Sequence, residues 1–240
     1  MPLRALGRAW RRPDLVASPP AAARQAAGAS VKQAAYEGFQ QALLSGRLRP
    51  GQLVSQRQMV GILGVSIGAL RELLPRLETE GLLTVLPQRG IQITAIDLPM
   101  IRDAFQMRAA YEREAVITAV RRMSDDELTR QRALHVDIMD RTRKDATLEI
   151  LAEGQTIDSG FHDLLIEATG NELLVRAYSI NAIRIRLIKL DRILLNPEIL
   201  PAAFGDHLAI IDAMLARDTA GAVEAMDHHI RNARERAVSF

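Results

Sequence analysis

The chain has 240 residues, of which 48% are hydrophobic and 25% charged, a balance typical of a globular protein with an apolar core. It contains no cysteine, which excludes a disulfide framework and a thiolate metal site and fits a reducing cytoplasm. Charged residues interrupt every apolar run before it reaches the roughly 18 residues of a transmembrane helix, so we expect no membrane span. The length suits two domains.

The net charge of +2 hides an asymmetry along the chain. Residues 1–94 hold 12 Lys and Arg against 5 Asp and Glu, a net of +7, whereas residues 95–240 hold 19 against 24, a net of −5. This pattern is expected when only one of two domains contacts nucleic acid. Part of the surplus lies in residues 1–28, where many arginines and the helix-interrupting Pro13, Pro19 and Pro20 predict a disordered basic tail; the composition also resembles a transit peptide.

Residues 29–96 read as three helices followed by a hairpin. The first helix runs from Val31 to Leu44, the second covers residues 56–63 and ends at Gly64, and the third is capped by Ser66. In the third helix one face is apolar and is formed by Leu70, Leu73, Leu74 and Leu77. Residues 83–85 and 91–93 read as two short strands around a turn. This order predicts a winged helix-turn-helix.

A helix that enters the major groove presents short or basic residues at its N-terminal end. Ser66 and Arg71 occupy such positions, Arg57 can hold a phosphate from the preceding helix, and Arg89 with Gly90 forms the tip of the wing. Each arginine taken alone is more often a solvated surface charge. Their gathering on one motif favours DNA binding.

Residues 97–240 read as helix almost to the end. A helix over residues 98–122 is followed by a capping box, Ser124 to Glu127, and further helices are predicted at residues 147–169, 171–195, 198–216 and 219–238. We therefore expect a mainly α protein with a second domain that is an all-α antiparallel bundle.

Four polar residues of this domain can form a metal site. Asp158 and His162 lie four residues apart, on one face of a helix, and His207 and His229 lie on later helices. Three imidazoles and a carboxylate suit zinc, nickel, iron or manganese and leave positions open for an acid ligand. On spacing alone, each histidine is more often a surface or core residue.

The first domain resembles the DNA-binding domain of the GntR family, through LSGRLRPGQL at residues 44–53, LGVS at 63–66, LRELL at 70–74 and RLETEGL at 76–82. The resemblance implies a homodimer that binds an operator palindrome through Arg57, Arg71 and the wing around Gly90. Ile67 departs from the family, which usually has Arg there, and can instead meet a thymine methyl. Pro75 also departs, and we expect it to bend the third helix.

The second domain resembles the ligand-binding domain of the FadR subfamily, through DSGFH at residues 158–162, ATGN at 168–171, and the pattern from HLAI at 207–210 to His229. The resemblance implies that Asp158, His162, His207 and His229 bind a divalent metal, expected to be zinc, nickel or manganese, which a small organic acid coordinates. We nominate Arg108, Asn171 and Arg184 as effector-binding residues, with Arg186 as a further choice. We place His228 and His135 on the surface and Phe161 and Tyr178 in the core.

These observations predict a cytoplasmic, ligand-responsive transcriptional regulator, a repressor that a small organic acid releases from its operator, and not an enzyme. Two alternatives stay open at this point. One is a metal-dependent enzyme that acts on a small acid, since open positions on a metal can activate water. The other is a DNA-binding protein whose helical domain only dimerises.

Overall fold

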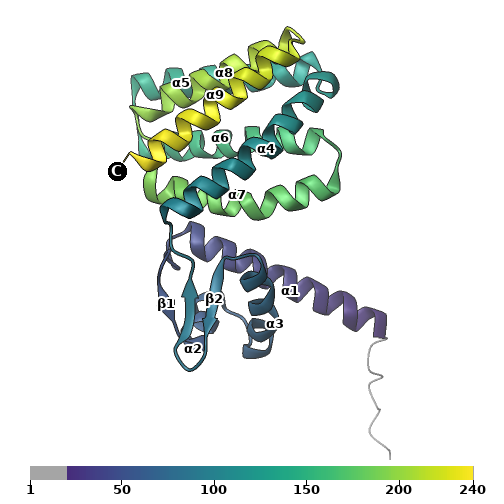
Figure 1. Ribbon diagram of the computed structural model, residues 1–240, viewed down its shortest axis with the longest axis vertical. Helices are drawn as coiled ribbons and strands as arrows, with labels where there is room; N and C mark the ends of the chain where they lie inside the picture. Colours follow the sequence, from purple (N-terminus) through teal and green to yellow (C-terminus); the bar gives the residue numbers. More distant parts are fainter. Residues whose placement is uncertain (1–20, 240) are drawn as a thin grey trace, which may run out of the picture.

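The computed structural model describes residues 21–239 and the side chains of residues 32–239. Figure 1 shows a smaller N-terminal body, here called the head, below a helical body, here called the bundle. The head consists of α1 Ala21–Leu44, β1 Leu53–Val54, α2 Gln56–Leu63, α3 Ile67–Thr79, β2 Leu83–Leu86 and β3 Gly90–Ile93. The bundle consists of α4 Leu98–Arg122, α5 Asp125–Lys144, α6 Leu148–Ala168, α7 Glu172–Arg192, α8 Ile199–Leu215 and α9 Thr219–Val238.

The helix α1 begins earlier than predicted. Residues 21–28, which we expected in a disordered tail, form its first turns, and residues 1–20 lie outside the described part of the chain. The segment from Ala21 is rich in alanine, the residue with the highest helix propensity, whereas our prediction started at the first periodic apolar residues. The tail prediction is therefore wrong for residues 21–28.

The helix-turn-helix forms as predicted. Gly64 ends α2 in the left-handed conformation, with φ of 65°, and Ser66 Oγ accepts a hydrogen bond of 3.1 Å from Ala69 N at the start of α3. The predicted apolar face of α3 is buried in the head. The helix continues through Pro75 to Thr79, although this proline has no N–H to donate to the carbonyl of Arg71.

The wing contains one strand more than we predicted. The sheet is antiparallel with the order β1–β3–β2, and β1 pairs with β3 through Leu53 opposite Gln92 and Val54 opposite Ile91. A two-residue strand carries no alternation, so the sequence offered no signal for it. Gly90 has φ of +124°, and a Cβ there would lie 2.6 Å from Val54 O, so the approach of β1 requires a glycine.

Five of the bundle helices lie within a few residues of their predicted ranges, and α5 starts at the predicted capping box. Side-chain caps fix several of their starts, including Asp97 for α4 and the predicted capping box of Ser124 and Glu127 for α5. In the packing, α4 contacts α6, α7 and α9, and α8 contacts α5 and α9. None of the helices in residues 21–239 is long and apolar enough to cross a membrane.

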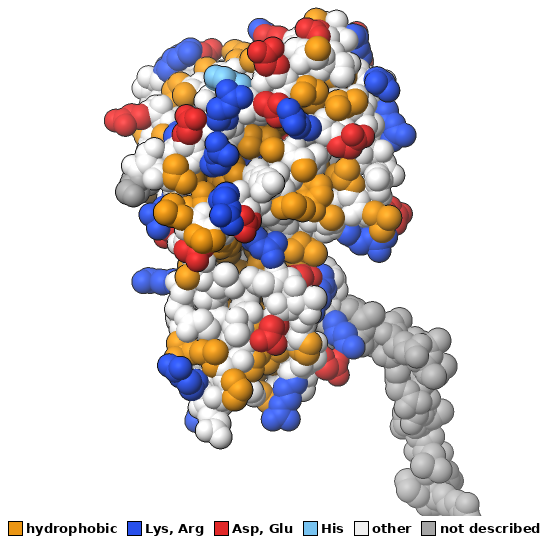
Figure 2. Space-filling view, in the orientation of Figure 1, with side chains coloured by type: hydrophobic (Ala, Val, Ile, Leu, Met, Phe, Trp, Pro, Cys, Tyr) orange, Lys and Arg blue, Asp and Glu red, His pale blue; other side chains and the backbone are white. Residues whose placement is uncertain are grey.

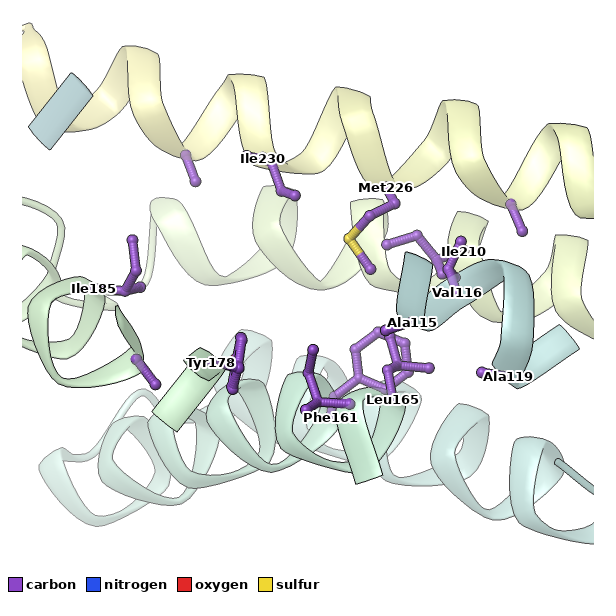
Figure 3. Packing of buried hydrophobic residues seen from close by; sticks show 14 of the residues in the cluster. Ala115, Val116, Ala119, Phe161, Leu165, Tyr178, Ile185, Ile210, Met226 and Ile230 are labelled. Carbon is purple, nitrogen blue, oxygen red and sulfur yellow. The ribbon is translucent and has the colours of Figure 1, made fainter. Parts of the chain in front are cut away.

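The bundle core is formed by side chains from facing helices. In Figure 3, Met226 and Ile230 of α9 point toward Phe161 and Leu165 of α6 and Tyr178 of α7. Phe161 and Tyr178 are buried in this cluster, which agrees with the core positions that we predicted for them.

The helix α7 also completes the core of the head. Ile183 and Leu187 pack in the same apolar cluster as the buried leucines of α3 and the wing. Next to them, Arg184 donates a hydrogen bond from Nη2 to the carbonyl of Glu80, the C-cap residue of α3. One helix of the bundle is therefore a structural part of the head.

Candidate functional site

Three histidines from three helices meet inside the bundle. His162 lies on α6, His207 on α8 and His229 on α9, and all three are buried. Their potential ligand nitrogens lie within 4.8 Å of one another, and the Nε2 atoms of His207 and His229 are 3.3 Å apart. The histidines that the sequence separates by up to 67 residues are thus brought to one point by the helix packing.

Asp158 lies beside this cluster, one turn before His162 on α6. Its Oδ1 is 3.8 Å from His207 Nε2, and its Oδ2 accepts a hydrogen bond from Lys189 Nζ. The carboxylate is almost fully buried. The structure thus brings together the four residues that we nominated as metal ligands.

A second layer of side chains contacts the outer Nδ1 atoms of the three histidines. Glu112 Oε2 is 2.9 Å from His162 Nδ1, Asp206 Oδ2 is 3.6 Å from His229 Nδ1, and His135 Nε2 is 3.1 Å from His207 Nδ1. Acceptors beside Nδ1 favour the tautomer with its proton on that atom, which leaves the Nε2 lone pair for a metal. The Nε2 atoms are the ones that face the centre.

The tautomer of His207 follows from its neighbours. The Gln131 carbonyl can only accept a hydrogen bond, so His135 Nδ1, 2.7 Å away, is the donor in the neutral ring. His135 Nε2 then accepts a hydrogen bond from His207 Nδ1. His207 Nε2 therefore carries a lone pair toward the centre.

The ionisation of these groups suits cation binding. Burial lowers the pKa of His229 to about 3 and the pKa of His207 well below its ordinary value, so both imidazoles are neutral near pH 7. Burial opposes ionisation of Glu112, but Arg108 and His162 outweigh it and lower the pKa of this carboxyl to about 2. Neutral imidazoles and ionised carboxylates are the forms that a metal requires.

Arg108 of α4 is buried against the histidines. Its Nη2 is 2.6 Å from His162 Nε2 and 3.3 Å from His229 Nε2, and its Nε donates to Glu112 Oε1 at 2.8 Å. A guanidinium has only donors, so both Nε2 atoms must be acceptors. Three imidazole nitrogens with inward lone pairs and an adjacent carboxylate fit a divalent transition metal.

Other nominated residues lie elsewhere. Asn171 is exposed and caps α7, its Oδ1 accepting from Leu173 N and Leu174 N, and Arg184 contacts the head, so the structure brings neither to the histidines. Arg186 forms a 2.7 Å ion pair with Asp163 instead. His228 is largely exposed, as predicted.

The surface position that we predicted for His135 is wrong. Its side chain is fully buried, with ring centroids 5.1 Å from Phe161 and 4.9 Å from Phe204, in addition to its hydrogen bond with His207. His135 lies seven residues after Leu128 and four before Met139, which places it on the buried face of α5. This spacing is visible in the sequence, but we placed His135 on the surface because it had no evident partner.

Sequence reasoning also missed most of the charged partners of the centre: Glu112, Lys189, Asp206 and Arg236. Arg108 and Glu112 lie four residues apart on the apolar face of α4, and this spacing could have predicted a buried ion pair. Lys189 could not be found this way, because its contact with Asp158 depends on how α7 lies against α6.

The head presents the nominated DNA-contact residues at its surface. Arg57, Ser66, Ile67, Arg71 and Arg89 are exposed, and Gly90 is partly buried under β1. Ile67 begins α3 with 45% of its surface exposed. Figure 2 shows Lys and Arg side chains at the end of the head farthest from the bundle. This arrangement agrees with a surface that faces a polyanion.

Comparisons with solved structures place this fold. E. coli McbR/YncC superposes with a TM-score of 0.66 at 19% identity, over 84% of this chain and 93% of that one, a likeness of fold alone. The chain is also similar to a structure described as the metal-free FCD domain of TM0439, with a TM-score of 0.50 and 25% identity over 60% of this chain and 95% of that one.

Sequence comparisons carry the family assignment. The model described as bacterial regulatory proteins, gntR family, matches residues 31–93, and the FCD domain model matches residues 103–232, more than half of the chain. The HTH-type transcriptional repressor GlaR of Escherichia coli (strain K12) is 28% identical over 200 residues, which cover 81% of this chain and 90% of that protein. The chain therefore belongs to the gntR family of bacterial regulatory proteins, carries an FCD domain, and is a transcriptional regulator rather than an enzyme.

Proposed function

We propose that the chain is a repressor of the FadR subfamily that binds an operator palindrome as a homodimer in the cytoplasm and is released by a small organic acid. The observation that carries this proposal is the pairing, in one chain, of a DNA-reading head with a buried centre of three histidines and an aspartate. The description of the relative GlaR as a transcriptional repressor supports the proposal that operator binding lowers transcription.

In the head, α3 enters the major groove with Ser66 and Ile67 first and Arg71 one turn later. Arg57 at the start of α2 holds a phosphate, and the wing around Arg89 and Gly90 follows the adjacent minor groove. Ile67 offers an apolar contact in place of a charge, which favours a thymine methyl at that step of the operator. The exposure of these side chains, Gly90 apart, supports this docking.

In the bundle, Asp158, His162, His207 and His229 hold zinc, nickel or manganese, which supplies a Lewis acid site for a carboxylate. Arg108 is placed to donate to the same carboxylate, because its Nη1 is buried and has no hydrogen-bond partner within residues 32–239. We assign Asn171 to the cap of α7 and Arg184 to the contact with the head.

The connection between the two bodies runs through α7. Lys189 on this helix contacts Asp158 of the centre, while Ile183 and Leu187 pack in the head. A ligand that changes how α7 lies against α6 therefore biases the position of the head. Two heads in a dimer read two half-sites at a fixed spacing, so such a shift weakens operator binding.

The test is a fluorescence anisotropy titration of the full chain with DNA from upstream of its own gene, with and without small organic acids, after loading with Zn²⁺, Ni²⁺ or Mn²⁺. We expect sequence-specific binding that at least one acid weakens. The variant His162→Ala with His229→Ala should bind DNA without responding, and His228→Ala is the matched control. Binding that no acid alters in any metal form would instead favour a bundle that only dimerises.

A further inference from the structure

A small cavity adjoins the histidine centre. Asp158, His229 and Arg108 line one part of it, Lys189 and Arg236 complete its polar wall, and the remaining wall is aliphatic, formed by Ile193, Leu195, Ile199, Ala203 and Ala233. Water-sized free space amounts to about 20 Å³, room for a water molecule or two. A ligand must therefore take over contacts that the lining side chains now make.

The charges inside the bundle balance without a ligand. Among the described residues, the buried ionic side chains of the bundle are Arg108, Lys189, Glu112 and Asp158, two cations and two anions. Arg236 and Asp206, both half-buried, add one charge of each sign. Imidazoles that bind a metal are neutral, so the protein side chains sum to zero. A divalent cation in the centre would leave two positive charges in surroundings where an uncompensated charge is costly.

Two cationic groups of the cavity have unused donors. Arg108 Nη1 and Arg236 Nε are buried atoms without a hydrogen-bond partner in the part of the chain that the structure describes. A buried donor that lacks an acceptor destabilises the protein, and a carboxylate supplies acceptors. Arg236 lies two turns after His229 on α9. The unused donor of Arg236 is therefore at the outer side of the cavity, whereas the unused donor of Arg108 is at the side of the histidines.

We propose that the effector is a short aliphatic dicarboxylate, whose first carboxylate is held at the histidine centre beside Arg108 and whose second is held by Lys189 and Arg236. This inference rests on the proposed function and specifies its ligand class. Two negative charges restore the balance that a divalent cation disturbs, whereas a monocarboxylate leaves one positive charge. Among the described side chains, none with a hydroxyl or amide group lines the cavity, which favours a methylene spacer over a sugar acid.

The experiment is isothermal titration calorimetry of the full Zn²⁺-loaded chain with matched pairs of acids of equal length. Succinate and glutarate should bind on the order of 10- to 100-fold more tightly than butyrate and valerate, the difference that one charge-assisted contact makes. Sulfate tests for a site that takes any dianion. Sulfate binding as tight as that of the dicarboxylates, or equal binding of the paired acids, would overturn the proposal.

The second part of the experiment removes the charge of Arg236, the cationic group at the outer side of the cavity. Arg236→Met keeps the stem of the side chain but not its charge, and it should lower the affinity for succinate to that for butyrate while butyrate binding stays unchanged. Arg234→Met, an exposed arginine on the same helix, is the matched control and should keep the preference. Lys189→Met should act as Arg236→Met does, with Zn²⁺ content measured alongside.

The two ideas fail separately. Acids that release the protein from DNA but bind without preference for a second carboxylate contradict the dicarboxylate assignment and leave the proposed function standing. A full preference that survives in Arg236→Met and Lys189→Met also contradicts it. Only the lack of any acid response in the DNA titration removes the proposed function itself.

Discussion

Arg71 is exposed on α3, four residues after Ile67 and outside the face of the buried leucines. If it contacts the operator, Arg71→Ala should weaken operator binding tenfold or more and reduce the slope of log K against log salt by about 0.9. Arg130→Ala, an exposed arginine on the bundle, should change neither quantity. Anisotropy titrations between low and moderate salt measure both. An unchanged slope would mean that Arg71 does not face the phosphates or bases.

His135 orients His207 through a single 3.1 Å contact and is surrounded by aromatic rings. His135→Phe keeps the ring but not the acceptor for His207 Nδ1, so we expect metal affinity to fall on the order of 10- to 100-fold. Competition with a chelator of known affinity measures the change, and thermal unfolding checks that the fold is kept. Wild-type affinity in this variant would show that the contact does not support the site.

At the scale of elements, α7 is the helix that both bodies share. Arg184→Ala removes its hydrogen bond to the end of α3 while leaving Ile183 and Leu187 in place. We expect operator affinity without ligand to change little and the ratio of affinities without and with the effector to shrink two- to thirtyfold, which corresponds to about 0.5–2 kcal/mol of coupling.

The control for this prediction is Arg176→Ala on the same helix, because Arg176 pairs only with Glu172 of its own helix among the described residues. Operator titrations with and without the releasing acid give the ratio for each variant. An unaltered ratio in Arg184→Ala would place the coupling outside this contact.

Elements whose signals are local could be predicted from the sequence. The starts of α3 and α5 depend on Ser66 and Ser124 and on residues three positions later, so a linear pattern was sufficient. The strand β1 could not be predicted because two residues acquire strand character only through pairing with β3. The same holds for the candidate site: the four nominated ligands come from motifs, but the contacts of Lys189 and Asp206 depend on how separate helices cross.

At the scale of the whole molecule, the buried histidines make stability depend on pH. Burial lowers the pKa of His229 from 6.5 to about 3, and those of His135, His162 and His207 are also lowered. Below pH 6.5 the unfolded chain therefore binds protons that the folded chain does not. The contribution of the histidines to the free energy of unfolding is fully present above that pH and is lost as pH falls toward 3.

We expect the free energy of unfolding of the metal-free protein to be level above pH 6.5 and to fall between pH 6.5 and 4.5, by up to about 1.4 kcal/mol per pH unit for each histidine. Glu112, with its pKa lowered to about 2, stays ionised in the folded protein throughout this range. Urea unfolding in the presence of a chelator measures the profile. A flat profile would show that the histidines are hydrated or already charged.

The apolar cluster that unites Ile183 and Leu187 with the leucines of α3 also limits how this regulator can be divided. A fragment cut after residue 96 would carry a DNA-reading domain whose hydrophobic interior stands open on one side. In the sequence, each of the two halves matches a family model of its own. The shared apolar cluster nevertheless means that the two halves do not fold independently. An exchange of sensor domains between such regulators would therefore have to keep the residues of α7 that pack against the head together with that head.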